Sequence, residues 1–212
     1  MLDPILNPLS QRILKPFAGW LVARNVGADQ VTLCGFVIGM LAVPALAFEH
    51  YTLALVFILL NRLSDGLDGA VARATRTTDA GGYLDIVLDF IFYSAVVLGF
   101  LLANPSQNAV AAGVLLVTFM GTGATFLAFA AIAAKRGIDN LQYPNKSLHY
   151  MGGLTEGFET IVAFVLFCLW PAQFPLLAGF FAAACWVTAV TRLYSGYQMI
   201  RPDQTKQYKQ EN

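Results

Sequence analysis

The chain has 212 residues, of which 57% are hydrophobic and only 12% are charged, and its mean hydropathy is +0.61. Soluble domains carry about 25% charged residues to cover their surface, so this composition excludes an ordinary soluble domain and predicts an integral membrane protein. The formal net charge is zero, and no basic tract or aromatic platform indicates a nucleic acid partner.

Residues 1–28 are predicted to form a helix that lies in the membrane interface. Helical spacing gathers apolar side chains on one face, at Ile5, Leu9, Ile13, Phe17 and Trp20 or Leu21. Arg12 and Lys15 lie on other faces, which is the pattern of an amphipathic interfacial helix. Pro16 predicts a kink or a break in this helix.

Six apolar segments follow, and each approaches the ~20 residues that are needed to cross ~30 Å of hydrocarbon. They cover residues 29–48, 51–74, 82–103, 109–134, 155–172 and 175–200. The sequence therefore predicts an all-α membrane protein with six transmembrane helices after the interfacial helix. It divides into the interfacial segment 1–28, a six-helix transmembrane domain 29–200 and a polar tail 201–212.

The basic residues predict how the chain is oriented in the membrane. All 13 Lys and Arg residues lie in the N-terminal segment, the connections 75–81 and 135–154, the C-terminal tail, or the helix ends beside them. The other three connections contain none. Because cytoplasmic segments carry an excess of Lys and Arg, this side of the protein, with both termini, is expected to face the cytoplasm.

Four aspartates stand inside the second and third apolar segments, where a charged residue costs roughly 2.5–3.5 kcal/mol at the bilayer centre. Asp65 and Asp68 are three residues apart, and Asp85 and Asp89 are four apart, so each pair shares one helix face. The connection between the two helices is short, which makes them antiparallel neighbours. The four carboxylates are therefore expected to converge near the cytoplasmic ends of both helices.

Like charges brought together repel each other, and one or two divalent cations would relieve this repulsion. Carboxylate oxygens suit Mg²⁺, Mn²⁺ or Ca²⁺. Two alternatives remain open, a proton or ion pathway and salt bridges to Arg62, Arg73 and Arg76. Asp79, in the connection itself, is either a site residue or an ordinary loop residue.

Small residues accompany the acids on the second predicted helix, at Gly66, Gly69, Ala70 and Ala72. One explanation is close helix packing. The other is that a phosphate-bearing ligand approaches the bare backbone while Arg73 meets its phosphates.

The complete pattern reads Asp65-x2-Asp68-Gly69-x2-Ala72-Arg73-x7-Gly81-x3-Asp85-x3-Asp89. It resembles the signature of the CDP-alcohol phosphotransferase family, integral membrane enzymes of phospholipid synthesis with six transmembrane helices. The spacer between the arginine and the second glycine has seven residues here, whereas family members usually have eight or more. We expect a tighter loop at this point.

The resemblance implies a role for each acid. Asp65, Asp68 and Asp85 would hold two Mg²⁺ or Mn²⁺ ions that bridge the pyrophosphate of a CDP-linked donor. Asp89 would contact the second ion and take the proton of an alcohol hydroxyl that attacks the β-phosphorus, so that CMP leaves.

The resemblance also implies that a nucleotide pocket is lined by Gly69, Ala72, Arg73 and Gly81. Thr32, at the start of the first apolar segment, resembles a family position near the nucleotide. A hydroxyl that bonds to its own helix is an equally good explanation of Thr32.

The short six-helix form resembles the branch that uses CDP-diacylglycerol (CDP-DAG) and a small polar alcohol, such as glycerol 3-phosphate, inositol phosphate, inositol or serine. Arg192, Lys135 and Arg136 are candidates to bind the acceptor, although basic residues at helix ends also serve topology. Glu156 is a further candidate, or it complements the dipole of the fifth predicted helix. Gly157 follows it where some phosphate-using relatives carry Arg, which weighs against a phosphorylated acceptor. Family resemblance also implies a homodimer.

Two other functions fit parts of the pattern. A membrane prenyltransferase also uses aspartate-rich helices and Mg²⁺, and Asn61-x3-Asp65 faintly resembles its motif, but such enzymes have longer chains. A cation transporter would distribute its acids through the membrane depth and contain an inverted repeat. Here the acids gather on one side, and the sequence has no repeat.

Overall fold

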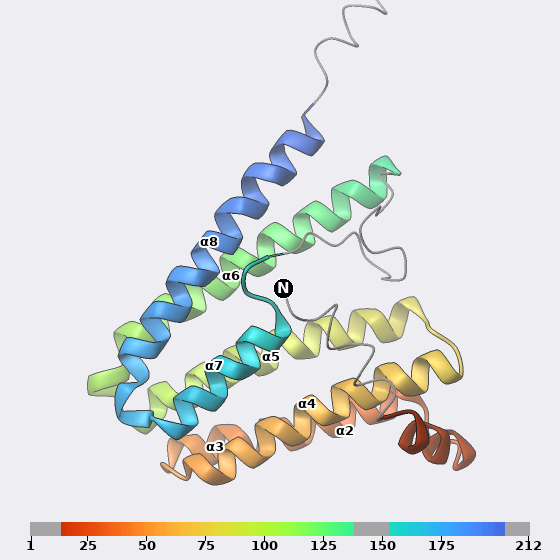
Figure 1. The fold of residues 1–212 in the computed structure, drawn as a ribbon, viewed down its shortest axis with the longest axis horizontal. Helices are drawn as coiled ribbons and strands as arrows, with labels where there is room; N and C mark the ends of the chain where they lie inside the picture. The colour runs from red at the N-terminus through yellow and green to blue at the C-terminus, as the bar shows by residue number, and fades with distance from the viewer. Residues whose placement is uncertain (1–13, 138–152, 202–212) are drawn as a thin grey trace, which may run out of the picture.

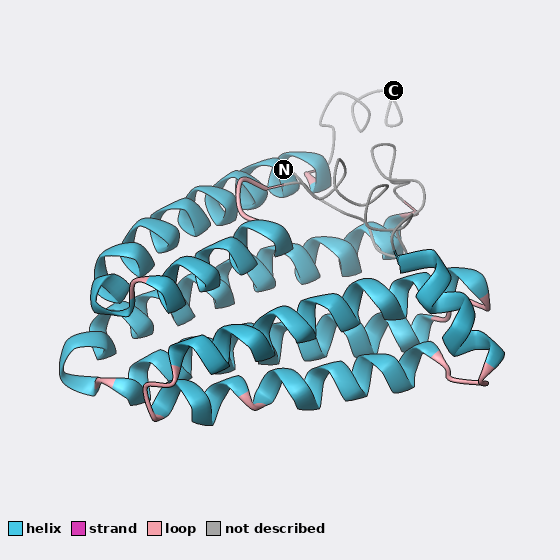
Figure 2. Cartoon of the chain, turned by 60° about the horizontal axis from the view of Figure 1, so that its bottom comes forward, coloured by secondary structure: helices cyan, strands magenta, loops and turns pink. Residues whose placement is uncertain are grey.

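The computed structural model describes residues 14–137 and 153–201, and the regular structure within these ranges is helical throughout (Figure 2). Residues 14–23 form a helical stretch. The elements that follow are α2 (Ala28–Met40), α3 (Ala42–Ala47), α4 (Tyr51–Ala74), α5 (Asp79–Ala103), α6 (Pro105–Arg136), α7 (Gly157–Leu169), the 3-10 turn η1 (Pro171–Gln173) and α8 (Phe174–Ile200) (Figure 1).

The first predicted span, 29–48, is divided in the structure into α2 and α3. Pro44 has no backbone N–H to donate to the carbonyl of Met40, and α2 ends at Met40. The second predicted span, 51–74, coincides with α4. The third begins three residues earlier than predicted, because Thr78 caps the helix at its N-terminus.

Within the described residues, four helical segments are long and apolar enough to cross a membrane, at Ala28–Ala47, Asp79–Ala103, Pro105–Arg136 and Pro171–Ile200. α4 is not among them because it contains Arg62, Asp65, Asp68 and Arg73. α7 has 13 residues and is about 20 Å long at 1.5 Å per residue, so it is shorter than the predicted segment 155–172. It begins after Glu156, whose backbone nitrogen donates to Oε2 of Glu159 at 3.1 Å, and ends before Pro171.

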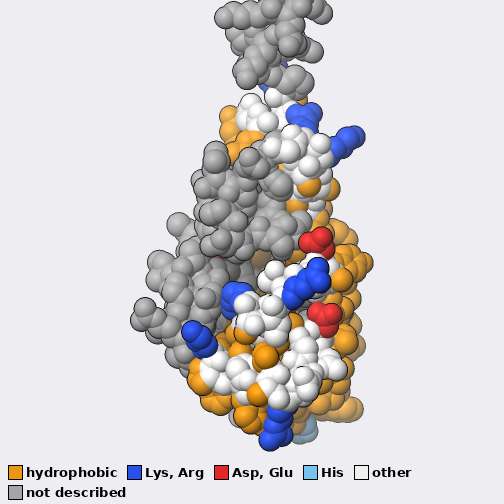
Figure 3. Space-filling model, turned by 90° about the vertical axis from the view of Figure 1, so that its right-hand side faces the viewer, with side chains coloured by type: hydrophobic (Ala, Val, Ile, Leu, Met, Phe, Trp, Pro, Cys, Tyr) orange, Lys and Arg blue, Asp and Glu red, His pale blue; other side chains and the backbone are white. Residues whose placement is uncertain are grey.

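α2 packs antiparallel on α4 and α4 antiparallel on α7, whereas α3 packs parallel to α5 and α6 parallel to α8 (Figure 1). The connections α3–α4, α5–α6 and α7–α8 lie at one end of the molecule, and the α4–α5 connection lies at the opposite end (Figure 1). Basic side chains gather on this second end (Figure 3).

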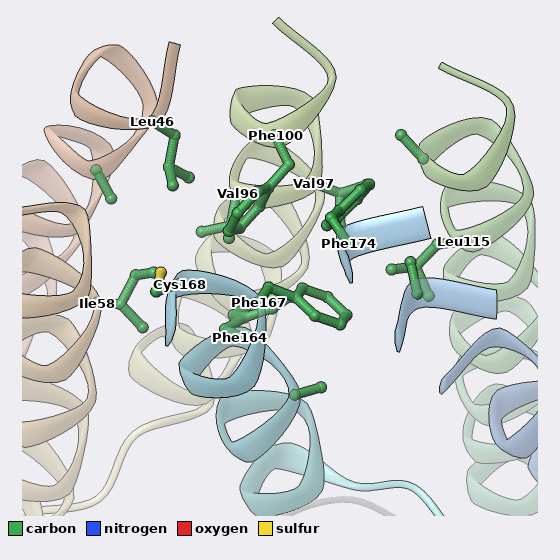
Figure 4. Close-up of a cluster of buried hydrophobic side chains, with 14 of the residues drawn as sticks. Leu46, Ile58, Val96, Val97, Phe100, Leu115, Phe164, Phe167, Cys168 and Phe174 are labelled. Carbon is green, nitrogen blue, oxygen red and sulfur yellow. The ribbon is translucent and has the colours of Figure 1, made fainter. Parts of the chain in front are cut away.

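A cluster of buried aromatic side chains joins α5, α7 and α8 away from the α4–α5 connection (Figure 4). The rings of Phe100 and Phe174 stack with centroids 4.8 Å apart, and Phe167 meets Phe174 edge-on at 5.1 Å. Aromatic pairs at these separations add to the packing energy. The cluster therefore holds the helices together at the end of the bundle that carries few charged side chains.

The helical stretch 14–23 packs on the end of α4 through Leu14 and Ala18, which are buried against Ala70 and Val71. Phe17 and Trp20 are 61% and 56% exposed, so the predicted apolar face points away from the protein in this stretch. Pro16 lies inside the helical stretch. Ile5, Leu9 and Ile13 are outside the described residues, as is most of the tail 201–212.

Candidate active site

The candidate site is built where α4 ends and α5 begins. Thr78 caps α5 by accepting a hydrogen bond from the backbone nitrogen of Gly81 to its side-chain oxygen at 3.0 Å. A Cβ atom on Gly81 would lie 3.0 Å from Oδ1 of Asp29 in the first turn of α2. A larger residue at position 81 would therefore have to push the side chain of Asp29 or Thr78 aside by a few tenths of an ångström.

Three of the four predicted carboxylates meet at one point. Asp65 of α4 and Asp85 and Asp89 of α5 are half-buried, and each offers one oxygen that lies within 4.8 Å of the other two. Oxygen ligands lie roughly 2.0–2.6 Å from Mg²⁺ or Ca²⁺, so oxygens this close can surround a single ion. The donor set is composed of hard oxygens and fits a divalent cation.

Asp68 lines a small cavity together with Asp65, Asp85 and Asp89, but its carboxylate is hydrogen-bonded to a different partner. It is 6% exposed, and its Oδ2 accepts a hydrogen bond of 2.6 Å from Oγ1 of Thr32 in α2. Oγ1 of Thr32 also lies 3.1 Å from the carbonyl of Ala28 in its own helix. A hydroxyl has one hydrogen to donate, and the shorter bond to a carboxylate is the stronger of the two. Thr32 therefore belongs to the acidic site.

Arg62 and Tyr93 form a network with two of the acids. Arg62 forms an ion pair with Asp65, and its Nη1 lies 3.7 Å from Oδ2 of Asp89. Nη1 also donates to the hydroxyl of Tyr93 at 2.9 Å, and that hydroxyl donates to Oδ2 of Asp89 at 3.0 Å. The salt-bridge alternative is thus realised for Arg62, whereas Tyr93 was not recognised in the sequence. Its position four residues after Asp89 places it on the same helix face and is a signal that was available.

Asn61 is the second residue whose place in the site the sequence did not reveal. Its Nδ2 donates to the carbonyl of Gly35 at 3.1 Å, and it lines the same cavity as the aspartates. Its Oδ1 is buried and has no hydrogen-bond partner among the described residues. Its spacing of four residues before Asp65 was noted only as a likeness to a prenyltransferase motif.

Apart from Thr32, the predicted nucleotide residues do not line the cavity that holds the aspartates. A Cβ atom on Gly69 would lie 3.1 Å from Nη1 of Arg73, so the exposed guanidinium folds back over this glycine. Ala72 is half-buried. Asp79 is exposed and does not join the acid cluster; it lines an apolar cavity of about 810 Å³ between α5 and α6 instead.

The predicted acceptor residues do not line the cavity that holds the aspartates. Arg192 is buried in α8, and its Nη1 lies 3.5 Å from the carbonyl of Thr122. Glu156 is also buried, and its Oε1 accepts a hydrogen bond from the backbone of Gly153 at 3.0 Å. Lys135 and Arg136 are exposed at the end of α6, where Arg136 donates to the carbonyl of Ile200.

Comparison with known proteins finds one matching family profile and several similar relatives. The sequence profile of the CDP-alcohol phosphatidyltransferase family matches residues 25–193. Over 201 residues, the chain is 55% identical to the inner membrane protein YnjF of Escherichia coli K12, which covers 95% of this chain and 98% of that relative. It is 37% identical over 106 residues to a phosphatidylinositol phosphate synthase of Streptomyces avermitilis, which covers 48% of this chain and 43% of that relative.

The fold is similar to that of Mycobacterium tuberculosis phosphatidylinositol phosphate synthase. The crystal structure of that enzyme with CDP-DAG bound has a TM-score of 0.70 at 24% identity, covering 88% of this chain and 94% of that chain. Its structure with manganese and citrate also has a TM-score of 0.70, at 23% identity, covering 87% and 88%. At these identities, the likeness establishes a shared fold.

Proposed function

Because this chain belongs to the CDP-alcohol phosphatidyltransferase family, we propose that it transfers a phosphatidyl group from CDP-DAG to the hydroxyl of a small polar alcohol and releases CMP. Membership in the family makes the chain an integral membrane transferase of substituted phosphate groups that acts in phospholipid synthesis. The observation that carries the finer proposal is the convergence of Asp65, Asp85 and Asp89 from two helices.

The choice of donor rests on the fold and on the place of the site. The similar M. tuberculosis enzyme binds CDP-DAG. The acids lie about 10–15 Å inside the ends of α4 and α5 at 1.5 Å per residue. A site at this depth leaves the lipid product in the bilayer and lets CMP escape into water.

In the proposed reaction, Asp89 accepts the proton of the acceptor hydroxyl, whose oxygen forms a bond to the β-phosphorus of the donor. The bond from that phosphorus to the bridging oxygen breaks, and its electron pair leaves with CMP. Asp65, Asp68 and Asp85, with Asp89, would hold one or two Mg²⁺ or Mn²⁺ ions. A bound divalent ion supplies neutralisation of the pyrophosphate charge.

The remaining residues orient the reactants. Thr32 fixes the carboxylate of Asp68 through its short hydrogen bond. Arg73 has an exposed guanidinium beside Gly69, and we assign it to the donor phosphates, with Ala72 and Gly81 on the same nucleotide pocket. Asp79 faces the apolar cavity, which favours its role as an ordinary first-turn acid of α5.

Arg192 is our leading candidate for binding the acceptor. It is a buried cation beside Gly153, where a Cβ atom would lie 3.1 Å from its Nη2, and Glu156 begins α7 from the same short segment. Lys135 and Arg136 are exposed at a helix end, which favours a role in topology. The acceptor in our proposal is a small polar alcohol that reaches the buried Arg192 cation.

We also propose six transmembrane helices, with α4 and the short α7 completing the four apolar spans, and a site that opens to the cytoplasm. The basic side chains at the α4–α5 end support this orientation. A homodimer stays a prediction of the family resemblance. Neither the prenyltransferase nor the cation transporter is supported by the family match.

The test is release of CMP by the purified protein supplied with CDP-DAG, Mn²⁺ or Mg²⁺, and each member of a panel of alcohols. One alcohol is expected to give metal-dependent CMP release together with the corresponding phospholipid. Asp89→Asn should lower the rate at least about 100-fold, as expected for loss of a general base. Glu49→Gln is the matched control, because it removes an exposed carboxylate at the opposite end of the bundle. Full activity of Asp89→Asn, or no CMP with any alcohol, would contradict the proposal.

A further inference from the structure

A permanent cation is built into the acidic site by α4 itself. Arg62 lies three residues before Asp65 and forms an ion pair with it, while its Nη1 is 3.7 Å from Oδ2 of Asp89. Asp65 and Asp89 are two of the three residues whose oxygens converge in the site. The guanidinium therefore uses carboxylates that a divalent ion would also need.

The guanidinium is held in this place by a second contact. Its Nη1 donates to the hydroxyl of Tyr93 at 2.9 Å, and the same hydroxyl donates to Oδ2 of Asp89 at 3.0 Å. The ring of Tyr93 packs edge-on against Phe164 of α7, with centroids 6.0 Å apart, which fixes the hydroxyl. Tyr93 thus anchors both the arginine and one carboxylate.

Two positive charges cannot share the same carboxylate oxygens without strong repulsion, particularly at a half-buried site where the effective dielectric is low. The side chain of Arg62 is 30% exposed, so water screens its charge only in part. Arginine stays protonated at every pH that a protein survives, so the site cannot remove this charge by releasing a proton. The side chain has to move when a divalent ion takes the same oxygens.

We propose that Arg62 and a divalent cation compete for Asp65 and Asp89, so that Arg62 sets the metal affinity of the site. The proposal rests on the function proposed above, which places a metal on these acids. Arg62 is then a positioning residue with two opposing effects. It keeps the carboxylates of Asp65 and Asp89 together, and it lowers the affinity of the site for the ion.

The test is isothermal titration calorimetry of Mn²⁺ into the purified full chain. Arg62→Gln should bind Mn²⁺ at least about tenfold more tightly than the wild type, because a unit charge about 4 Å away is removed. Arg62→Lys keeps the charge and should give a smaller gain. Arg76→Gln removes an exposed charge just beyond the end of the same helix and should change the affinity less than about twofold.

A merely structural role for Arg62 predicts the opposite sign, because carboxylates that are no longer held together bind an ion less well. Unchanged or weaker Mn²⁺ binding by Arg62→Gln would therefore overturn the inference. Tyr93→Phe provides a second test that leaves the arginine in place. It releases Oδ2 of Asp89 and loosens the guanidinium, so it should also bind Mn²⁺ more tightly, and weaker binding would overturn the inference as well.

Mn²⁺ binding distinguishes failure of the metal site from failure of the competition between Arg62 and the ion. If the wild type, Arg62→Gln and Tyr93→Phe all bind no Mn²⁺, the metal site of the proposed function is wrong and the inference falls with it. If the wild type binds Mn²⁺ but Arg62→Gln binds no more tightly, only the competition is wrong. Thermal unfolding in the same Mn²⁺ concentration gives an independent readout, because the tighter-binding variant should show the larger metal-induced increase in melting temperature.

Discussion

Among single residues, Thr32 connects α2 to α4 through one hydroxyl. Its Oγ1 lies 2.6 Å from Oδ2 of Asp68, 36 positions along the chain. Asp68 is 6% exposed, and a buried carboxylate without a donor is costly. The hydroxyl therefore holds Asp68 in one orientation toward the cavity that it shares with Asp65, Asp85 and Asp89.

Thr32→Val is expected to lower the rate of CMP release about tenfold, as loss of one hydrogen bond to a charged group predicts. The volume of the side chain is nearly unchanged, so the protein should remain folded. Thr32→Ser keeps the hydroxyl and should retain most of the activity. Equal activity of the valine and wild-type proteins would show that Thr32 only bonds to its own helix.

At the scale of elements, the site depends on how closely α2 approaches α4. A Cβ atom on Gly35 would lie 2.4 Å from Cβ of Ser64, so the two helices touch where Gly35 has no side chain. Nδ2 of Asn61 donates to the Gly35 carbonyl in the same contact. This register places Thr32 opposite Asp68.

Gly35→Ala should therefore destabilise the protein by about 1–3 kcal/mol, the usual cost of overpacking. The measurement is thermal unfolding of the purified protein in detergent. Gly113→Ala is the matched control, because no atom lies within 4 Å of a Cβ atom at that helical position. It should be neutral or stabilising by up to about 1 kcal/mol. A loss of stability in both variants would point to a general effect of glycine replacement.

The whole molecule has two unlike ends, and this asymmetry predicts its orientation. The connection between α4 and α5 lies at the end with the basic side chains, whereas the α5–α6 turn lies at the other end (Figures 1 and 3). Cytoplasmic segments carry the excess of Lys and Arg. The site acids lie in the halves of α4 and α5 that are nearer the basic end.

Cysteine labelling tests this orientation. Thr77 and Ser106 are exposed on opposite ends, so Thr77→Cys and Ser106→Cys can be compared in a protein in which exposed Cys34 is replaced by Ser. A membrane-impermeant maleimide is expected to label position 77 only in inverted vesicles and position 106 only in right-side-out vesicles. The reverse result would place the active site on the outer side.

The sequence predicted the helices well, because apolar content and helical periodicity are local properties. α4 coincides with the predicted segment 51–74, and the convergence of Asp65, Asp85 and Asp89 followed from spacing and a short connection. The break at Leu41 was missed, although Pro44 carried its signal. The shorter α7 was missed, although the capping residue Glu156 and Pro171 marked its two ends.

The sequence by itself thus determined an all-helical membrane protein and the motif that identifies its family. Only the tertiary structure decided which group each acid meets: Thr32 for Asp68, Arg62 and Tyr93 for Asp89, and an apolar cavity for Asp79. These partners come from different helices or depend on side-chain direction. They are set by the register in which α2, α4 and α5 pack, and that register depends on contacts such as Gly35 against Ser64, which no local pattern encodes.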